Sequence, residues 1–221
     1  CVTGYIQGTA NFGTIELVCT GTDVFVAKLD NEGNWLWATR SDGSGNHYSK
    51  GIAIDAYGNS YITGDFVDII NFGTSALSSN GNRDIFVAKI DANGNWVWGQ
   101  RAGGFASAYA YAIAAGDNYC YITGKIRDGA TFGSTTLSSY GYNDIFVAKI
   151  SFLGSWFWAV NAGSTGNDEG LGIAVDASGH CYVTGKFTRA ANFGTISVGT
   201  GTTHSQLFVG LVDSNGSWYS V

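Results

Sequence analysis

The strongest constraint on the fold of this chain is a sequence pattern that returns every 60 or 61 residues. A Tyr-Ile-Thr-Gly tetrad at residues 61–64 recurs at 121–124, as Tyr-Val-Thr-Gly at 182–185, and in shortened form at 2–4. Each copy then carries Phe-Gly, a Phe-Val-Ala-Lys segment and a Trp-x-Trp pair, and the fourth copy keeps the last two only in part. A repeat of this kind predicts one supersecondary unit per copy, stacked on neighbours of the same type.

Short segments rich in β-branched and aromatic residues predict β-strands in every copy. In the second copy these segments span 52–55, 60–66, 85–91 and 95–101. Turn residues separate them, as at Asn93-Gly94, because Asn-Gly tolerates the positive φ of a hairpin turn. No segment of helix length shows apolar residues at the roughly 3.6-residue spacing of a helix. About four antiparallel strands per copy are therefore expected.

A four-stranded sheet repeated at a fixed period is typical of a β-propeller, in which sheets called blades stack around an axis. We predict a single all-β domain of four blades, at approximately residues 1–50, 51–110, 111–171 and 172–221. The first copy has no counterpart of segment 51–56, so its blade is expected to lack the opening strand. A linear β-solenoid is the alternative fold, although its coils are usually shorter than these repeats.

Two features suggest that the chain belongs to a longer or processed polypeptide. The sequence contains no Met, and therefore no initiator residue. The final segment, 219–221, stops before it could supply the strand that the first copy lacks. We therefore expect one part of a longer multi-repeat protein, because an unpaired sheet edge otherwise invites edge-to-edge pairing.

The order of the motifs resembles the SBBP family of bacterial β-propeller repeats. The shared pattern is Gly-x-Ala-x-Asp-x-x-Gly, Tyr-Ile/Val-Thr-Gly, Phe-Gly, Asp-Ile/Val-Phe-Val-Ala-Lys and Gly-x-Trp-x-Trp, and it runs from Val2 to Trp218. The resemblance implies a secreted or surface-exposed bacterial protein, rings larger than four blades, and no catalytic residues, since the family has no agreed catalytic site. The chain departs from the pattern at Ala115, Gln206 and Gly210.

Composition excludes several classes of function. Charged residues make up 13 % of the chain, and 11 Lys and Arg stand against 17 Asp and Glu for a net charge of −6. A nucleic-acid binder needs a basic stripe, which so few scattered cations cannot form. No apolar run reaches the roughly 18 residues of a transmembrane helix. Low charge and many Gly, Ser, Thr and Asn residues favour an extracellular or cell-surface location.

No catalytic site is expected from the sequence. The histidines His47, His180 and His204 fall at different positions of the repeat, whereas a propeller lyase or hydrolase needs His or carboxylates that converge on the axis. Zinc-ligand spacing and a phosphate-binding glycine loop are both missing.

Calcium is the one cofactor left open, because oxygen ligands recur at short spacing in the turns. The weak calcium candidates are Asp30, Asp91, Asn93 and Asp213. Hairpin turns explain the same residues without a metal.

Residues that recur from copy to copy are expected to hold the fold rather than a ligand. The two indoles of a Trp-x-Trp pair lie on one face of a strand because side chains alternate, so we expect them to pack between blades. The lysine of the Phe-Val-Ala-Lys segment is expected to pair with an acidic neighbour such as Asp55 or Asp176. The aspartates before this segment are expected to accept backbone N–H bonds and tie strands together. They are Asp23, Asp84 and Asp144.

The aromatic residues that do not recur are the best candidates for a binding site. They fall in segments predicted as loops, and loops on a rigid scaffold often carry binding residues. The candidates are Tyr48, Phe105, Tyr109, Tyr140 and Tyr142. We therefore predict a non-enzymatic interaction or structural module that binds a protein partner in adhesion or surface assembly. The alternative is a lectin-like propeller with one shallow site per blade for a surface glycan, with or without calcium.

Overall fold

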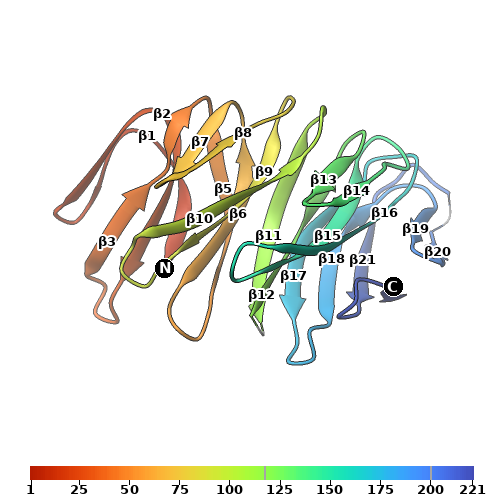
Figure 1. Cartoon of the computed structure of the whole chain (residues 1–221). Coiled ribbons are helices and arrows are strands. Elements are labelled where there is room, and N and C mark those ends of the chain that lie inside the picture. The colour runs from red at the N-terminus through yellow and green to blue at the C-terminus, as the bar shows by residue number, and fades with distance from the viewer. Residues whose placement is uncertain (117, 200) are drawn as a thin grey trace.

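The computed structural model describes residues 1–116, 118–199 and 201–221. Every regular element in these ranges is a β-strand, and the ladders between named strands are antiparallel (Figure 1). The predicted all-β architecture of antiparallel sheets is confirmed. Among the described residues there is no helix that is long and apolar enough to cross a membrane.

Four blade-like sheets follow one another through the described ranges. The first holds β1 (Val2–Phe12), β2 (Ile15–Leu29) and β3 (Trp35–Arg40). The second holds β5 (His47–Ile54), β6 (Ser60–Phe66), β9 (Asp84–Ile90) and β10 (Trp96–Gly103). The third holds β11 (Ala108–Gly116), β12 (Tyr119–Ile126), β15 (Asp144–Ser151) and β16 (Trp156–Gly163). The fourth holds β17 (Glu169–Val175), β18 (Cys181–Phe187), β21 (Gln206–Val212) and β22 (Trp218–Ser220).

Short hairpins connect each sheet to the one before it. They are β7 (Ile69–Phe72) with β8 (Ser75–Ser78), β13 (Ala130–Phe132) with β14 (Thr135–Leu137), and β19 (Ala191–Phe193) with β20 (Ile196–Val198). Strand β13 pairs with β10, β19 pairs with β16, and β7 pairs with β4 (Asp42–Ser44), which follows β3. The later copies therefore have six strands rather than the expected four or so. The sequence prediction misses the extra pair because such short segments show no clear alternation.

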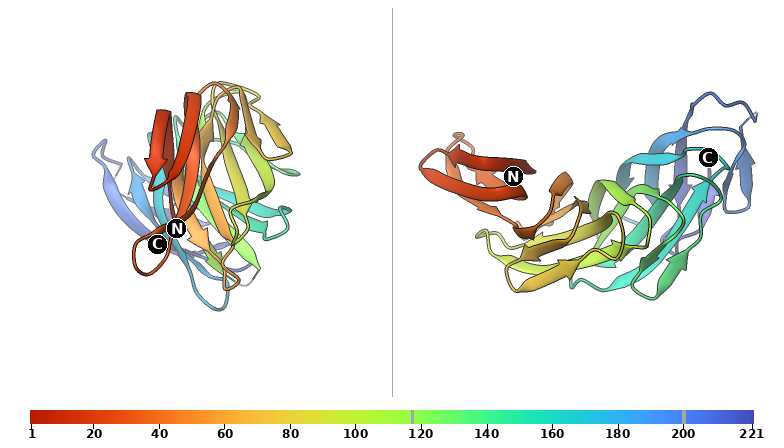
Figure 2. Two further views of the ribbon diagram at one scale, coloured as in Figure 1. Left: turned by 90° about the vertical axis from the view of Figure 1, so that its left-hand side faces the viewer. Right: turned by 90° about the horizontal axis from the view of Figure 1, so that it is seen from above.

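The sheets are arranged along an open arc, with the N-terminal and C-terminal sheets at its two ends (Figure 2). Strands β5, β11 and β17 each form the edge of their own sheet, and β11 lies beside both of the others. Because the edges of three sheets meet there, these inner strands mark the side toward which the sheets converge. This is the arrangement of propeller blades. The number of blades in a closed ring stays a prediction.

Each inner strand carries a β-bulge at the same point of the repeat. The pairing of β5 with β6 shifts around Lys50, and the equivalent shifts leave Tyr111 and Leu171 unpaired in β11 and β17. The tetrad glycine lies opposite this point, where a Cβ on Gly64 would come within 1.9 Å of the Tyr48 carbonyl oxygen. Close approach of the two strands therefore requires glycine. A bulge changes the direction of the side chain at the inserted residue. The same point of the repeat therefore presents a different residue in each copy.

The recurring tryptophan and lysine contact the turn of the following repeat. Trp98 Nε1 donates to the Phe152 carbonyl at 3.1 Å, and Lys89 Nζ donates to the same oxygen at 3.4 Å. The Phe152 ring stacks on Tyr61 at 4.5 Å between ring centroids. Packing of the indoles between blades is thus confirmed, but the expected lysine–carboxylate pairs are wrong. Asp55 accepts N–H and O–H donors from its own turn and the next strand instead.

Asp84 and Asp144, which begin β9 and β15, accept backbone N–H bonds as expected, whereas Asp23 pairs with the Arg40 guanidinium at 3.0 Å. The Asn80 N–H donates to Asp84 Oδ2 at 2.9 Å, and the Tyr140 N–H donates to Asp144 Oδ2. Both aspartates are buried. They anchor the loops that lead into these strands.

Candidate functional site

The sequence candidates Tyr48 and Tyr109 lie in strands, not in loops. Tyr48 is in β5 and Tyr109 is in β11, so their placement in loop segments is wrong. At the start of both strands buried residues alternate with half-buried ones, and the tyrosines are on the half-buried positions. Strands β5 and β11 contain few large apolar residues, so the sequence pattern does not identify them as strands over their full length.

Arg83 brings these two tyrosines into one site. Its guanidinium carbon lies 5.1 Å from the ring centroid of Tyr48 and 6.0 Å from that of Tyr109. A guanidinium at this distance is attracted to the negative face of an aromatic ring. Tyr48 also meets Tyr5 of the first sheet edge-on, with the centroids 4.9 Å apart. Residues from three successive sheets therefore meet here.

Two lysines flank the pair of tyrosines on β11. Tyr109 and Tyr111 stack with ring centroids 6.3 Å apart. Lys50 Nζ lies 5.1 and 4.8 Å from these two centroids, and Lys125 Nζ lies 5.2 and 5.7 Å from them. The β-bulges position both Lys50 and Tyr111. Burial raises the pKa of the Tyr111 phenol, and Lys125 partly offsets that rise.

Two carboxylates pair with the cations. Asp65 is buried and binds Lys50 Nζ at 2.5 Å as well as the Arg83 guanidinium. Glu169 binds Lys125 Nζ at 2.7 Å and Lys186 Nζ at 3.4 Å. Burial works to raise the pKa of Glu169, but the two lysines outweigh it and hold the pKa below its ordinary value.

These side chains form one set on the inner strands and on the chain beside them in β6, β12, β18 and just before β9, which we call the inner cluster. It consists of Tyr48, Lys50, Asp65, Arg83, Tyr109, Tyr111, Lys125, Glu169 and Lys186. Four cations face two carboxylates, a surplus of two positive charges in a chain whose net charge is −6. A local positive surplus on an acidic protein favours an anionic partner at this surface.

One signal in the sequence points to the inner cluster. The residue after the tetrad glycine varies between copies, as Tyr5, Asp65, Lys125 and Lys186, although the tetrad itself recurs. Because the tetrad before it recurs, the fold itself does not determine which residue follows the tetrad glycine. The partners of Tyr5 and Lys125, however, are Tyr48 and Glu169 of the next sheet, and spacing alone does not identify them.

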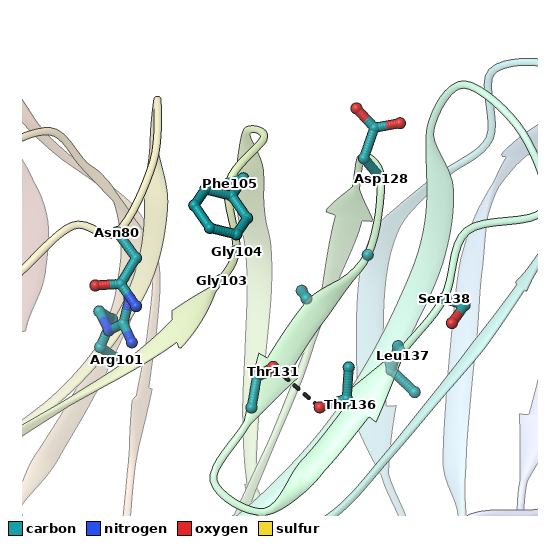
Figure 3. A pocket seen from close by; sticks show the side chains of 12 residues that line it. Asn80, Arg101, Gly103, Gly104, Phe105, Asp128, Thr131, Thr136, Leu137 and Ser138 are labelled. Carbon is teal, nitrogen blue, oxygen red and sulfur yellow. Dashed lines mark hydrogen bonds between the residues drawn. The ribbon is translucent and has the colours of Figure 1, made fainter.

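A separate pocket of about 630 Å³ lies along the end of β10 and the β13–β14 hairpin that pairs with it (Figure 3). The candidate Phe105 stands at its rim and is 94 % exposed. Arg101, Asp128 and Thr131 also line the pocket, and Figure 3 shows Thr131 hydrogen-bonded to Thr136 below the rim. An exposed ring among polar side chains is the composition of a shallow polar-ligand site. Arg101 is already paired with Asp84 at 2.7 Å.

The two remaining aromatic candidates lie apart from both of these sites. The Tyr142 ring lies under Arg127, with the guanidinium carbon 4.6 Å from the ring centroid. Tyr140 lines a pocket of about 390 Å³ with Trp218, between the third and fourth sheets. The structure therefore divides the five candidates: Tyr48 and Tyr109 share the inner cluster, whereas Phe105, Tyr140 and Tyr142 line separate loop surfaces.

The calcium candidates lie in hairpin turns whose own N–H groups bind the carboxylates. Asp91 Oδ1 accepts N–H bonds from Asn93 and Asn95, both at 2.9 Å. Asp30 and Asp213 accept equivalent bonds within their turns. The bonds from Asn95 lower the pKa of Asp91. Within the described ranges there is no group of three or more His, Cys, Asp or Glu that could hold a metal ion.

No family model matches the chain. An uncharacterised WD repeat-containing protein of Acanthamoeba polyphaga mimivirus is 26 % identical over 205 residues, which cover 77 % of this chain but 15 % of that protein. A crystal structure of a protein of unknown function from Bacteroides caccae gives a TM-score of 0.41 at 8 % identity, covering 99 % of this chain and 92 % of the other. The sheets and the WD-repeat similarity are consistent with an all-β repeat protein of the propeller type.

Proposed function

We propose that this chain is a non-enzymatic interaction module whose inner cluster binds an anionic segment of a protein partner. The observation that carries the proposal is the surplus of cations, packed among three tyrosines, on the strands where the sheets converge. The similarity to a WD repeat-containing protein supports a propeller-type module.

The chemistry of the inner cluster suits carboxylates on an extended chain. Lys50 and Lys186 keep 32 % and 41 % of their side chains exposed, so their ammonium groups can still reach a ligand. Asp65 and Glu169 hold the cations in place, and the tyrosine rings limit their motion. A preorganised cationic surface raises the association rate of an anionic partner, and salt screens the effect.

We further propose an extracellular or cell-surface location, as part of an adhesion or surface assembly. The resemblance to SBBP repeats and the low charged fraction of 13 % support it.

Three of the four cysteines, Cys19, Cys120 and Cys181, are free and buried, so they behave as small apolar core residues.

One observation favours a second candidate function, glycan binding. The pocket of Figure 3 combines the exposed Phe105 ring with Arg101, Asp128 and two threonines. Sugars stack on aromatic faces and bind polar side chains at their rims. Binding of neutral glycans that is lost in Phe105→Ala would support this function over the first.

The test of the first function uses a fluorescein-labelled oligoglutamate peptide and fluorescence anisotropy at low ionic strength. We expect binding that Lys50→Gln/Lys186→Gln weakens about 10-fold, since each surface charge contributes a fraction of a kcal/mol to about 1 kcal/mol. The matched control is Arg189→Gln, which removes an exposed cation outside the inner cluster. Equal affinity for oligoglutamate and a neutral oligoserine peptide would contradict the proposal. An equal loss in the control variant would also contradict it.

A further inference from the structure

The contacts between consecutive sheets, which we call seams, each hold a buried aspartate at the same point of the repeat. A backbone hydrogen bond crosses the second and third seams beside this point. The Ala108 N–H donates to the Arg83 carbonyl oxygen in one, and the Asp168 N–H donates to the Asn143 carbonyl oxygen in the other, both at 2.9 Å. The two seams can therefore be compared position by position. The aspartates of the three seams are Asp23, Asp84 and Asp144.

The first two seams supply a cation to this aspartate from the chain itself. Asp23 binds the Arg40 guanidinium at 3.0 Å, and His47 Nδ1 lies 3.2 Å from its other carboxylate oxygen. Asp84 binds the Arg101 guanidinium at 2.7 Å. Burying a charge is costly unless an opposite charge or a metal ion compensates it. In these two seams an arginine does so.

The third seam replaces the cation with a second carboxylate. Asn161 stands where the second seam has Arg101, and Asp168 stands where it has Ala108. Both Asp144 and Asp168 are fully buried. Among the described residues, the ion pairs include neither of them. Two carboxylates are therefore buried at one seam without a cation from the chain.

The two carboxylates point into the same small space. A Cβ on Gly163 would lie 2.3 Å from Asp144 Oδ1 and 2.9 Å from Asp168 Oδ2, so only glycine keeps this space open. Asp144 Oδ1 is buried and has no hydrogen-bond partner. In the second seam Asp84 Oδ1 has the equivalent place beside Gly103, but no second carboxylate joins it there. The third seam thus directs two acidic oxygens, one of them without a partner, to one point.

Hydrogen bonds fix the orientation of the second carboxylate. The Ser164 N–H donates to Asp168 Oδ2 at 2.5 Å, and the Ser164 hydroxyl lies 3.1 Å from Oδ1. The Thr188 N–H donates to Oδ1 at 2.8 Å. Donors of this kind orient the carboxylates that bind metal ions. Thr165 and Asn167 of the same loop are exposed, so solvent reaches the loop beside this point.

We infer that the third seam binds a calcium ion between Asp144 and Asp168, in place of the arginine of the other seams. Calcium takes oxygen ligands, and two carboxylates neutralise its double charge. The flexible coordination of calcium suits an irregular loop, whereas magnesium demands a near-ideal octahedron. The Ser164 hydroxyl and water are the further oxygen donors available there. The ion would join the third sheet to the fourth.

The site is a weak one and shares no residue with the inner cluster, so it goes beyond the proposed function. Two acidic ligands are fewer than the three that a tight site brings together, and we expect a dissociation constant on the order of 1 mM. Glu169, the next residue along the chain, is paired with Lys125 and Lys186 and stays outside the site.

The test follows the thermal unfolding midpoint of the chain, freed of metal with EDTA and dialysed, as calcium chloride is added at mildly alkaline pH. Sodium chloride keeps the ionic strength constant. We expect the midpoint to rise, since a ligand that binds the folded state stabilises it, with a half-maximal effect at about 1 mM. Asp168→Asn removes one charged ligand and should weaken binding about 10-fold or more. Asn161→Arg keeps both carboxylates but supplies the cation of the second seam, so it should abolish the response to calcium.

Asp91→Asn is the matched control, because it removes a carboxylate from a hairpin turn and leaves the third seam intact. This variant should keep the wild-type response. Circular dichroism checks folding, and Asn161→Arg decides the test where Asp168→Asn does not fold. A wild-type midpoint that calcium does not move would overturn the inference, as would a full response in Asn161→Arg. Loss of the response in Asp91→Asn would place the ion in the hairpin turn and would also overturn it.

Discussion

The second and third repeats place an aspartate at the same point of the same strand but surround it with different charges. Asp84 Oδ2 binds the Arg101 guanidinium at 2.7 Å and the Asn80 N–H at 2.9 Å. At the equivalent place Asp144 has no arginine, because Asn161 replaces it and donates instead to the Ser138 carbonyl at 2.7 Å.

A second carboxylate further separates the two environments. Asp168 lies where the previous seam has Ala108, and both carboxylates approach Gly163. A Cβ on that glycine would lie 2.3 Å from Asp144 Oδ1 and 2.9 Å from Asp168 Oδ2. Burial raises the pKa of Asp144 to about 6, and the negative charge of Asp168 adds to the rise. Both aspartates therefore accept a backbone N–H bond, but the neighbouring charge is positive in the second repeat and negative in the third.

The largest expected effect comes from removing the cation beside Asp84. Arg101→Ala leaves a fully buried carboxylate without its ion pair, so we expect a loss of about 3–4 kcal/mol in the free energy of unfolding. Asn161→Ala, the equivalent change in the third repeat, should cost about 1 kcal/mol because one neutral hydrogen bond is lost. Urea denaturation measures both. The double variant Arg101→Ala/Asp84→Asn should recover part of the loss, and equal losses in the two single variants would contradict the comparison.

The next effect is a pH dependence confined to the third repeat. The folded pKa of Asp144 is about 6 against an ordinary value of 3.8, so the folded state binds its proton more tightly than the unfolded state does. Stability from this group is complete below pH 3.8 and is lost as pH rises through 6, by up to about 3 kcal/mol. In Asp144→Asn this loss should disappear.

Urea denaturation at a series of pH values across this window checks the prediction. The quantity compared is the unfolding free energy of the wild type minus that of Asp144→Asn. This signed difference should rise as pH falls from 6 toward 3.8, because only the wild type gains stability there. Asp84→Asn is the matched control, because Arg101 neutralises the carboxylate there. The same pH profile for both variants would argue against the carboxylate pair.

A smaller effect is expected from giving the third repeat the residue of the second. Asn161→Arg places a guanidinium beside Asp144, which should lower the pKa of that carboxyl and raise stability at neutral pH by about 1 kcal/mol. Asn161→Gln is the control that lengthens the side chain without adding charge. Thermal unfolding at neutral pH measures the change. An Asn161→Arg variant that is less stable than Asn161→Gln would show that the site has no room for the cation.

The smallest effect is at the edge of the inner cluster. Lys186→Ala breaks a partly exposed pair with Glu169 at 3.4 Å, so we expect a loss of about 0.5 kcal/mol that decreases at high salt. Lys125 continues to hold Glu169 in this variant. Urea denaturation at low and high salt tests the prediction. A loss that does not change with salt would point to packing by the lysine stem instead.

Much of the fold follows from the repeat, but the short hairpins and the bulges do not. Apolar runs rich in β-branched and aromatic residues, such as segment 85–91, are long enough to identify a strand, and Asn93-Gly94 identifies its turn. Strand β13 has three residues, too few to show a period. The bulge at Lys50 depends on how closely the β5 backbone approaches Gly64, a distance that a single strand does not encode.

The sequence by itself determined the all-β class, the period of the repeat and the residues that face a neighbouring sheet, because these depend on local alternation and turn chemistry. Tertiary structure decided which residues of different repeats meet: Lys50 with Tyr109 and Tyr111, and Asp144 with Asp168. The separation of these residues in space depends on how one sheet stacks on the next. That stacking also covers three seams and leaves one face open at each end of the arc.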